Sequence, residues 1–470
     1  MLFSSISFLY YFLPLVLFVY FLVPRRAKNF VLLLASLVFY FYGEPVYTLL
    51  LLASTLSAYL HGLLIDRTRG TRACRAFLWS SVMTSVALLG FFKYSDFFIQ
   101  NVNTLLSTRI PLLRLALPIG ISFYTFQTIS YVIDVYRGQA KAQKSYWKFF
   151  MYVSLYPQLV AGPIVRYTDV AAEIEERSAN KEDFAAGIAR FCIGLSKKVL
   201  IANIAGDFAS RYLDGDLSGL TTAGAWFGIL MYAIQIYFDF SGYSDMAIGL
   251  ARLFGFHYVE NFNYPYISRS ATEFWRRWHI SMGSFFRDYV YIPMGGNRRH
   301  QFVNLFVVWF LTGLWHGASW NFVLWGLWFF VFLMIERLFL KKFLEKVPVL
   351  SNIYLLVVVL LGWVIFRFTN LELGMTLVKS LFGLNGNPLT GFVVDIEFDS
   401  HIYLLILSVL VSTPLARILR FQTERRICTN RAAYAVWQVV LYSIIPVVLL
   451  LLSTASLVGD SYNPFIYFQF

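Results

Sequence analysis

The chain has 470 residues, of which 58% are hydrophobic and only 14% are charged; its net charge is +13 and its mean hydropathy is +0.62. Soluble domains carry about 25% charged residues, so this composition excludes an ordinary soluble protein. Repeated long apolar runs instead predict an all-α polytopic membrane protein, because transmembrane helices satisfy their own backbone hydrogen bonds in lipid. In such a protein, basic loops between spans explain the positive charge better than nucleic-acid binding does.

The apolar runs set the expected span count. Twelve candidate spans lie near residues 6–23, 30–43, 45–65, 76–99, 117–135, 184–205, 222–250, 302–319, 321–340, 350–368, 401–419 and 434–456. The first run has neither a basic n-region nor a small-residue cleavage site, which predicts a retained span. Residues 146–165 and 271–295 mix apolar residues with Pro, Gly and charge, and we expect re-entrant or interfacial segments there. We expect one membrane domain over residues 1–470.

Basic residues predict the orientation of the chain. Six clusters lie between runs: Arg25, Arg26 and Lys28; Arg67, Arg69, Arg72 and Arg75; Arg137, Lys141, Lys144 and Lys148; Arg298 and Arg299; Lys341, Lys342 and Lys346; Arg417, Arg420, Arg425, Arg426 and Arg431. If the spans alternate, all six fall on one face. The positive-inside rule makes that face cytoplasmic and both termini extracytoplasmic.

Several chemistries find no support in the sequence. Cys74, Cys192 and Cys428 are far apart and have no metal-ligand spacing, so we expect neither a metal site nor a redox role. No phosphate-binding or dinucleotide-binding glycine motif is present, which argues against an ATP-driven pump.

His316 stands out, because it lies in Thr-Gly-Leu-Trp-His-Gly-Ala-Ser-Trp-Asn (312–321) between two apolar runs. An ionisable group at membrane depth is costly, and its default interpretation is functional. A neutral imidazole can accept a proton from a hydroxyl or thiol, which suits a general base in acyl transfer. The alternative is a hydrogen-bonded core histidine. Trp315 would line the same site, and Ser319 and Asn321 are candidate donors to an oxyanion.

His279 lies in a second unusual segment, residues 272–300, which combines tryptophan, arginine and glycine. A continuous helix would place Trp275, His279 and Met282 on one face, with Arg276, Arg277 and Asp288 free to pair or to face a headgroup. One interpretation is an interfacial amphipathic helix. The other is a lining for a phosphate-bearing donor. The remaining histidines, His61, His257, His300 and His401, lie near span ends and are expected to be interfacial.

The run at 222–250 carries an exceptional polar load. It contains Gln235, Asp239, Ser241, Ser244 and Asp245. Unpaired, these groups would be prohibitive in lipid, so they must face protein or water. They indicate either the polar wall of a tunnel or helix–helix hydrogen bonding. We favour the tunnel, and Asp239 or Asp245 could orient a histidine.

Together these segments resemble the membrane-bound O-acyltransferase family, and within it the bacterial branch of alginate O-acetylation. The resemblance rests on Trp-His-Ile-Ser, on Arg-Asp-Tyr-Val-Tyr-Ile-Pro-Met-Gly-Gly-Asn-Arg, on Gly-Leu-Trp-His-Gly-Ala-Ser-Trp, and on stretches at 117–127, 156–167, 235–245 and 261–270. It covers essentially the whole chain, with the motifs concentrated in a core acyltransferase region at 117–370. One departure is Met-Gly-Ser-Phe-Phe after Trp-His-Ile-Ser, which leaves the acyl chain open.

The resemblance implies a tunnel through the membrane with His316 as the invariant histidine and His279 as the second polar position. It further implies acetyl-CoA as the acyl donor with no permanently bound cofactor, an extracytoplasmic acetyltransferase partner, and a polysaccharide as final acceptor. Two alternatives stay open: D-alanyl transfer from a carrier-protein thioester to teichoic acid, and a histidine-gated proton-coupled transporter. The transporter would be expected to show an inverted repeat, and none is evident.

Overall fold

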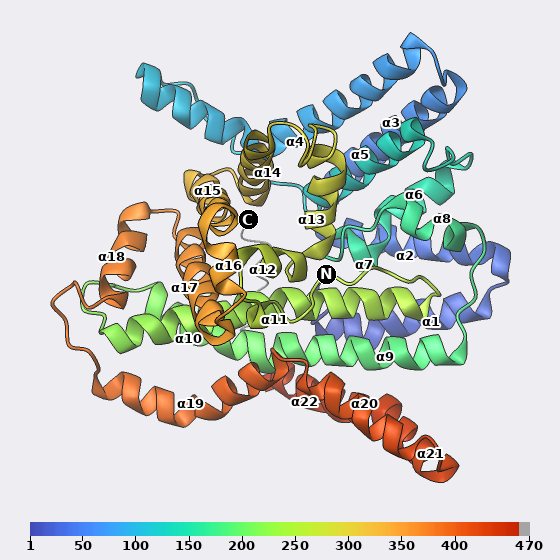
Figure 1. The fold of residues 1–470 in the computed structure, drawn as a ribbon. Coiled ribbons are helices and arrows are strands. Elements are labelled where there is room, and N and C mark those ends of the chain that lie inside the picture. Colours follow the sequence, from blue (N-terminus) through green and yellow to red (C-terminus); the bar gives the residue numbers. More distant parts are fainter. Residues whose placement is uncertain (460–470) are drawn as a thin grey trace. The chain divides into compact units, whose positions relative to one another are not determined.

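The computed structural model describes residues 1–459, and every regular element in that range is a helix (Figure 1). The predicted all-α architecture is therefore confirmed. The chain divides into two compact units, although the sequence showed no boundary. Unit 1 comprises Met1–Phe191 with Met246–Val259, and unit 2 comprises Cys192–Asp245 with the described residues from Glu260 onward.

Unit 1 is built from helices of very different lengths. In chain order they are α1 (Leu13–Leu22), α2 (Lys28–Gly43), α3 (Tyr47–Arg67), α4 (Arg72–Leu106), α5 (Ile121–Arg137), α6 (Tyr146–Ser154), α7 (Tyr156–Leu159), α8 (Tyr167–Glu175) and most of α9 (Lys181–Ser196). Helix α5 is buried along most of its length. Glycines delimit it, because Gly120 and Gly138 have φ values of 78° and 75°, which other residues rarely adopt.

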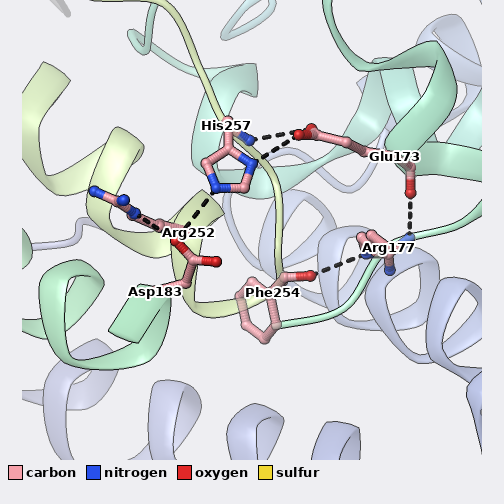
Figure 2. Close-up of polar contacts among 6 residues, drawn as sticks. All are labelled: Glu173, Arg177, Asp183, Arg252, Phe254 and His257. Carbon is pink, nitrogen blue, oxygen red and sulfur yellow. Dashed lines mark hydrogen bonds and ion pairs between the residues drawn. The ribbon is translucent and has the colours of Figure 1, made fainter. Parts of the chain in front are cut away.

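A polar cluster joins three segments of unit 1 (Figure 2). The ring of His257 lies between two carboxylates, with Nδ1 2.7 Å from Glu173 and Nε2 3.3 Å from Asp183. Arg252 bonds the same Asp183 oxygen at 2.9 Å, and Arg177 donates to the carbonyl of Phe254. Burial opposes the charged ring, but the hydrogen bonds and charges of the two carboxylates outweigh it and raise the pKa of His257. The cluster therefore ties α8, α9 and the segment after α11 together.

Unit 2 holds the other α-helices, except that the end of α11 from Met246 onward belongs to unit 1. After a π-helix (Lys197–Ala202) they are α10 (Asn203–Leu213), α11 (Thr222–Leu253), α12 (Ala271–Arg277), α13 (Ile280–Phe286), α14 (Gln301–His316), α15 (Trp320–Ile335), α16 (Lys341–Leu344), α17 (Pro348–Arg367), α18 (Leu371–Leu381), α19 (Phe392–Val411), α20 (Leu415–Ile427), α21 (Arg431–Val439) and α22 (Ile445–Gly459). Helices α14 and α15 run side by side, and α17 packs against α15 (Figure 1).

Burial separates the interior helix from the lipid-facing ones. In the most apolar window of α11, 78% of residues are buried, whereas the corresponding fraction is 11% for α4 and 6% for the helix over Arg431–Gly459. Exposed apolar surface of that extent is expected only against lipid. The chain is therefore a multi-pass membrane protein with α11 at the core of unit 2.

The described residues contain six helices long and apolar enough to cross a membrane, or seven if the bent pair α19–α20 is one span. The sequence suggested twelve. The difference arises because several apolar runs form shorter helices than the roughly 20 residues that a span requires. Helices α2, α5 and α14 have 16, 17 and 16 residues. The irregular stretches at 146–165 and 271–295 do form broken helices, and their depth in the membrane stays a prediction.

Candidate functional site

The helix expected around His279 is broken at that residue. Helix α12 ends at Arg277 and α13 begins at Ile280, and His279 between them has φ 45° and ψ 53°. The expectation that Trp275, His279 and Met282 share one helical face was therefore wrong. The break is held by an extended segment: the backbone N–H of Ile280 donates to Asn261, and that of Asn263 donates to Arg277. A fully buried histidine in this strained conformation is typical of a functional position.

Helix α12 is anchored at its first turn by two side chains. Ser270 accepts from the backbone N–H of Glu273, as an N-cap does. Buried Glu336 accepts from the N–H groups of Ala271 and Thr272 at 2.5 and 3.0 Å. Since Glu336 follows directly on α15, this contact fixes α12 against the helix pair that carries His316.

Asn261 determines which nitrogen of the His279 ring carries the hydrogen. Its Oδ1 accepts from the backbone N–H of Ser281 at 3.2 Å, and its Nδ2 donates to Ser244 at 3.0 Å, which identifies the two ends of the amide. Nδ1 of His279 lies 3.1 Å from the same Oδ1. Because a carbonyl oxygen only accepts, Nδ1 must carry the hydrogen. The neutral ring then presents a lone pair at Nε2.

The environment of His279 keeps the ring neutral. Its side chain is fully buried, and burial lowers its pKa to about 3. Among the described residues Nε2 has no hydrogen-bond partner. Native proteins pair nearly all buried polar atoms, so this nitrogen is a candidate acceptor for a ligand hydrogen.

His316 is the last residue of α14 and lies among aromatic rings. Its ring centroid is 4.9 Å from Trp315, 4.8 Å from Trp325 and 5.2 Å from Phe366, in each case close to edge-on. The Trp315 indole is also 5.7 Å from the ring of His279. Trp315 therefore contacts both histidines, and the two rings belong to one site in unit 2.

Two glycines bring α14 and α15 close enough to form this site. A Cβ on Gly313 would collide with the backbone of Phe322, and a Cβ on Gly326 would collide with the carbonyl oxygen of Trp309. Backbone atoms cannot rotate away from such contacts as side chains can. The helix pair that carries His316, Trp325 and Asn321 therefore depends on both glycines.

The two carboxylates predicted within α11 bind lysines. Asp239 forms a buried ion pair with Lys198, with Nζ 2.7 Å from Oδ1, and Lys198 also donates to Asn203 at 2.8 Å. Asp245 lies 2.7 Å from Nζ of Lys197, in a less buried position. For His279 the orienting residue is Asn261 rather than either of these carboxylates.

The remaining predicted residues lie in different environments. Arg277 is engaged by Glu273 at 2.9 Å and by the carbonyl of Asn263, whereas Arg276 is exposed. Gln235 is buried against Gly206 of α10. The indole of Trp275 packs on Trp309, Trp325 and Phe329. Of the two predicted arginines, Arg276 is the one whose guanidinium is open to an incoming phosphate.

Asn321 does not have the geometry of an oxyanion donor. Its Nδ2 donates to the carbonyls of Ile365 and Phe366 at 3.3 and 3.0 Å, so both amide hydrogens are engaged. This contact secures the end of α17 beside His316. By contrast, the indole N–H groups of Trp275 and Trp325 are buried and have no acceptor in the part of the chain that the structure describes. They are better candidates to meet a developing negative charge.

Two structural residues of this site were not singled out from the sequence. Asn261 lies 18 residues before His279, and no local pattern marks that contact. Lys198 did carry a signal, because Lys197 and Lys198 interrupt the apolar run at 184–205 and two lysines there require partners. Across the described residues, no group of three or more His, Cys, Asp or Glu side chains could hold a metal ion.

Comparison with known proteins gives consistent matches. Residues 79–378 match the family model of MBOAT, the membrane-bound O-acyltransferase family. A probable alginate O-acetylase of Pseudomonas putida is 38% identical over 487 residues, covering 100% of both chains. A peptidoglycan O-acetyltransferase of Helicobacter pylori is 36% identical over 425 residues, 82% of this chain and 80% of the relative. A teichoic acid D-alanyltransferase of Bacillus subtilis is 28% identical over 240 residues, 47% of this chain and 60% of the relative.

Proposed function

The chain belongs to the membrane-bound O-acyltransferase family and is an O-acyltransferase, and we propose that it transfers acetyl from acetyl-CoA for O-acetylation of a polysaccharide. The observation that carries the proposal is that His279 and His316 both contact the Trp315 ring. In addition, Nε2 of His279 is buried and has no hydrogen-bond partner among the described residues. Two relatives named for O-acetylation, of alginate and of peptidoglycan, favour acetyl as the acyl group and a cell-envelope polymer as the final acceptor.

In the proposed reaction His316 takes the proton from the acceptor hydroxyl. The hydroxyl oxygen attacks the thioester carbonyl and forms the C–O bond, while the C–S bond breaks. The proton passes from the imidazolium to the departing sulfur, so the products are an O-acetyl ester and the free thiol of CoA. A general base of this kind typically contributes about 10²–10⁴-fold in rate.

The other groups prepare the donor. His279 positions the donor by accepting, at the lone pair of Nε2, a hydrogen from an amide N–H beside the thioester, and the free indole N–H groups of Trp275 and Trp325 stabilise the oxyanion. One such donor is worth about 10²–10³-fold. Arg276 supplies a positive charge for donor phosphate.

We place the protein in the bacterial plasma membrane with both termini extracytoplasmic, because the basic clusters then face the cytoplasm. Acetyl-CoA would reach the site from that side. A partner acetyltransferase on the opposite side would receive the acyl group and pass it to the polymer.

The direct test uses purified protein with acetyl-CoA labelled in the acetyl group. We expect release of the CoA thiol together with appearance of label in a hydroxyl acceptor. A second candidate, transfer from a carrier-protein thioester, is favoured by the weaker match to a teichoic acid D-alanyltransferase. Activity with a D-alanylated carrier protein and none with acetyl-CoA would establish that alternative and refute the acetyl-CoA proposal.

A further inference from the structure

Unit 1 contains a cavity of about 710 Å³ that is lined by the loop joining α5 to α6, by Lys148 of α6 and by one side of α8. Helices α6 and α8 also pack against each other (Figure 1). Its lining includes Gln143, Ser145, Thr168 and three lysines, Lys141, Lys144 and Lys148. These residues are distinct from the histidine site, and the proposed acetyl transfer does not use them.

The loop that carries the lysines is anchored. The backbone N–H of Ala140 donates to the carbonyl of Asp134 at 3.2 Å, and that of Gln143 donates to the Tyr131 hydroxyl at 3.0 Å. The Tyr59 hydroxyl donates to the carbonyl of Lys144 at 2.7 Å. Ala140, Ala142 and Gln143 are buried, whereas Lys141 and Lys144 are exposed. The two ammonium groups are therefore presented from a fixed backbone.

Charge in the cavity is unbalanced. Among the lining residues the one carboxylate is that of Glu175, at the end of α8. It already binds Lys148 at 2.5 Å and Gln143 at 2.9 Å. Neither Lys141 nor Lys144 has an ion pair with any described residue. Two uncompensated positive charges beside a hollow favour an anionic ligand.

The opposite wall leaves room for that ligand. The side of α8 that faces the cavity consists of Thr168, Ala171 and Ala172 ahead of Glu175. Small side chains there create space, and the hydroxyl groups of Ser145 and Thr168 can donate to anionic oxygens. Tyr167 is buried and its hydroxyl accepts from Gln143 at 3.1 Å, so it offers no exposed face for stacking a base. The lining therefore suits phosphate groups rather than an aromatic base.

We propose that this cavity binds a phosphate-bearing ligand through Lys141 and Lys144, with the hydroxyl groups of Ser145 and Thr168 completing the polar lining. A positive-inside loop accounts for the lysines alone, but not for an anchored backbone around a hollow of this volume. The volume exceeds the space that one phosphate needs, so a diphosphate or a phospholipid headgroup fits the same chemistry.

Two binding experiments separate the sources of that phosphate. In the first, the purified full-length protein in neutral detergent is titrated calorimetrically with adenosine 3′,5′-diphosphate. In the second, the protein in phosphatidylcholine nanodiscs is compared with and without phosphatidylglycerol, using a spin-labelled phosphatidylglycerol to report contact. Binding in either experiment that weakens at least about tenfold in Lys141→Gln/Lys144→Gln supports the proposal and names the source.

Two further variants test whether the position of the charge, rather than the net charge of the protein, determines binding. Lys341→Gln/Lys342→Gln removes the same charge from α16 and is expected to leave binding unchanged. Glu175→Gln removes the competing carboxylate and frees Lys148, so binding should tighten several-fold. No binding in either experiment, or equal loss in the two double-lysine variants, would overturn the proposal. Because no readout involves acyl transfer, failure here leaves the proposed function untouched.

Discussion

His279 and His316 contact the same indole: the Trp315 ring lies 5.7 Å from one imidazole and 4.9 Å from the other. They come from different elements, a strained junction between short helices and the last turn of α14. The histidines therefore form neither an isolated pair of core residues nor two remote positions. With Trp315 between the two imidazoles, the proposed site can hold the donor thioester beside His279 and the acceptor hydroxyl beside His316.

Asn261 is expected to act as a positioning residue through His279. Replacement by leucine removes the acceptor of Nδ1 and should lower kcat about 10²-fold, because the ring loses both its orientation and its tautomer. Asn261→Asp keeps an acceptor but adds a charge that favours the protonated ring. Its activity should fall less, and the acid limb of the pH–rate profile should move to higher pH.

Ser284→Ala is the matched control, since Ser284 donates to the carbonyl of Ser281 and does not contact Asn261. It should retain nearly full activity with an unchanged pH profile. Equal kcat in Asn261→Leu and Ser284→Ala would remove Asn261 from the account.

The Lys198–Asp239 ion pair is expected to be structural. Lys198→Met removes the lysine partner of the buried Asp239 carboxylate and should destabilise the protein by about 3–5 kcal/mol. Lys197→Met breaks a more exposed pair and should cost about 1 kcal/mol or less. Thermal unfolding in detergent measures both. The double variant Lys198→Met/Asp239→Leu should recover much of the loss, and a cost equal to that of Lys198→Met would contradict this interpretation.

Gly326→Ala is expected to separate α14 from α15. Its Cβ would meet the carbonyl oxygen of Trp309, so the helices must shift at a cost of about 1–3 kcal/mol. Because α14 carries His316, acyl transfer should fall more steeply than stability. Gly90→Ala in α4 meets nothing within 4 Å and should leave both unchanged or raise stability slightly. Equal behaviour of the two variants would refute the packing argument.

The contrast between His316 and Asn261 shows how far sequence reasoning reached. His316 was recognisable because burying an ionisable side chain between apolar runs costs free energy and usually indicates a function. Asn261 was not, since its role depends on a contact that forms only when α12 and α13 separate at His279. A continuous helix in the segment 272–300 would place Trp275, His279 and Met282 on one face, but hydrogen bonds from Asn261 stabilise a break at His279 instead.

For the polar residues of α11, the sequence likewise predicted that partners exist but not which residues they are. The sequence required partners for Asp239 and Asp245, but hydrophobicity alone could not choose between histidines, water and the lysines of the preceding π-helix. For a related reason, the span count of twelve exceeds the six or seven described helices that are long and apolar enough to cross a membrane. Apolar runs such as 30–43 and 302–319 mark buried or lipid-facing segments equally, so their number exceeds the number of helices long enough to cross the membrane.

His257 should make stability depend on pH. Its pKa is raised in the folded protein, so its contribution is complete below the ordinary value of 6.5 and is lost as pH rises through the folded value. Asp183 has a lowered pKa, and its contribution is lost only in acid, outside this window. Unfolding temperatures measured from pH 6 to 9 should therefore show wild type exceeding His257→Gln at pH 6, with the gap narrowing as pH rises. If the unfolding temperatures of wild type and His257→Gln change in parallel with pH, the stabilising role of the His257 contacts drawn in Figure 2 is contradicted.

The most direct measurement is acetyl transfer from labelled acetyl-CoA by His316→Ala, in a preparation whose unfolding temperature matches that of the wild type. We expect the rate to fall about 10²–10⁴-fold, because the general base is lost while the aromatic site around it stays in place. His279→Ala, measured in parallel, should also lose activity. A folded His316→Ala protein that retains the wild-type rate of acetyl transfer would contradict the account.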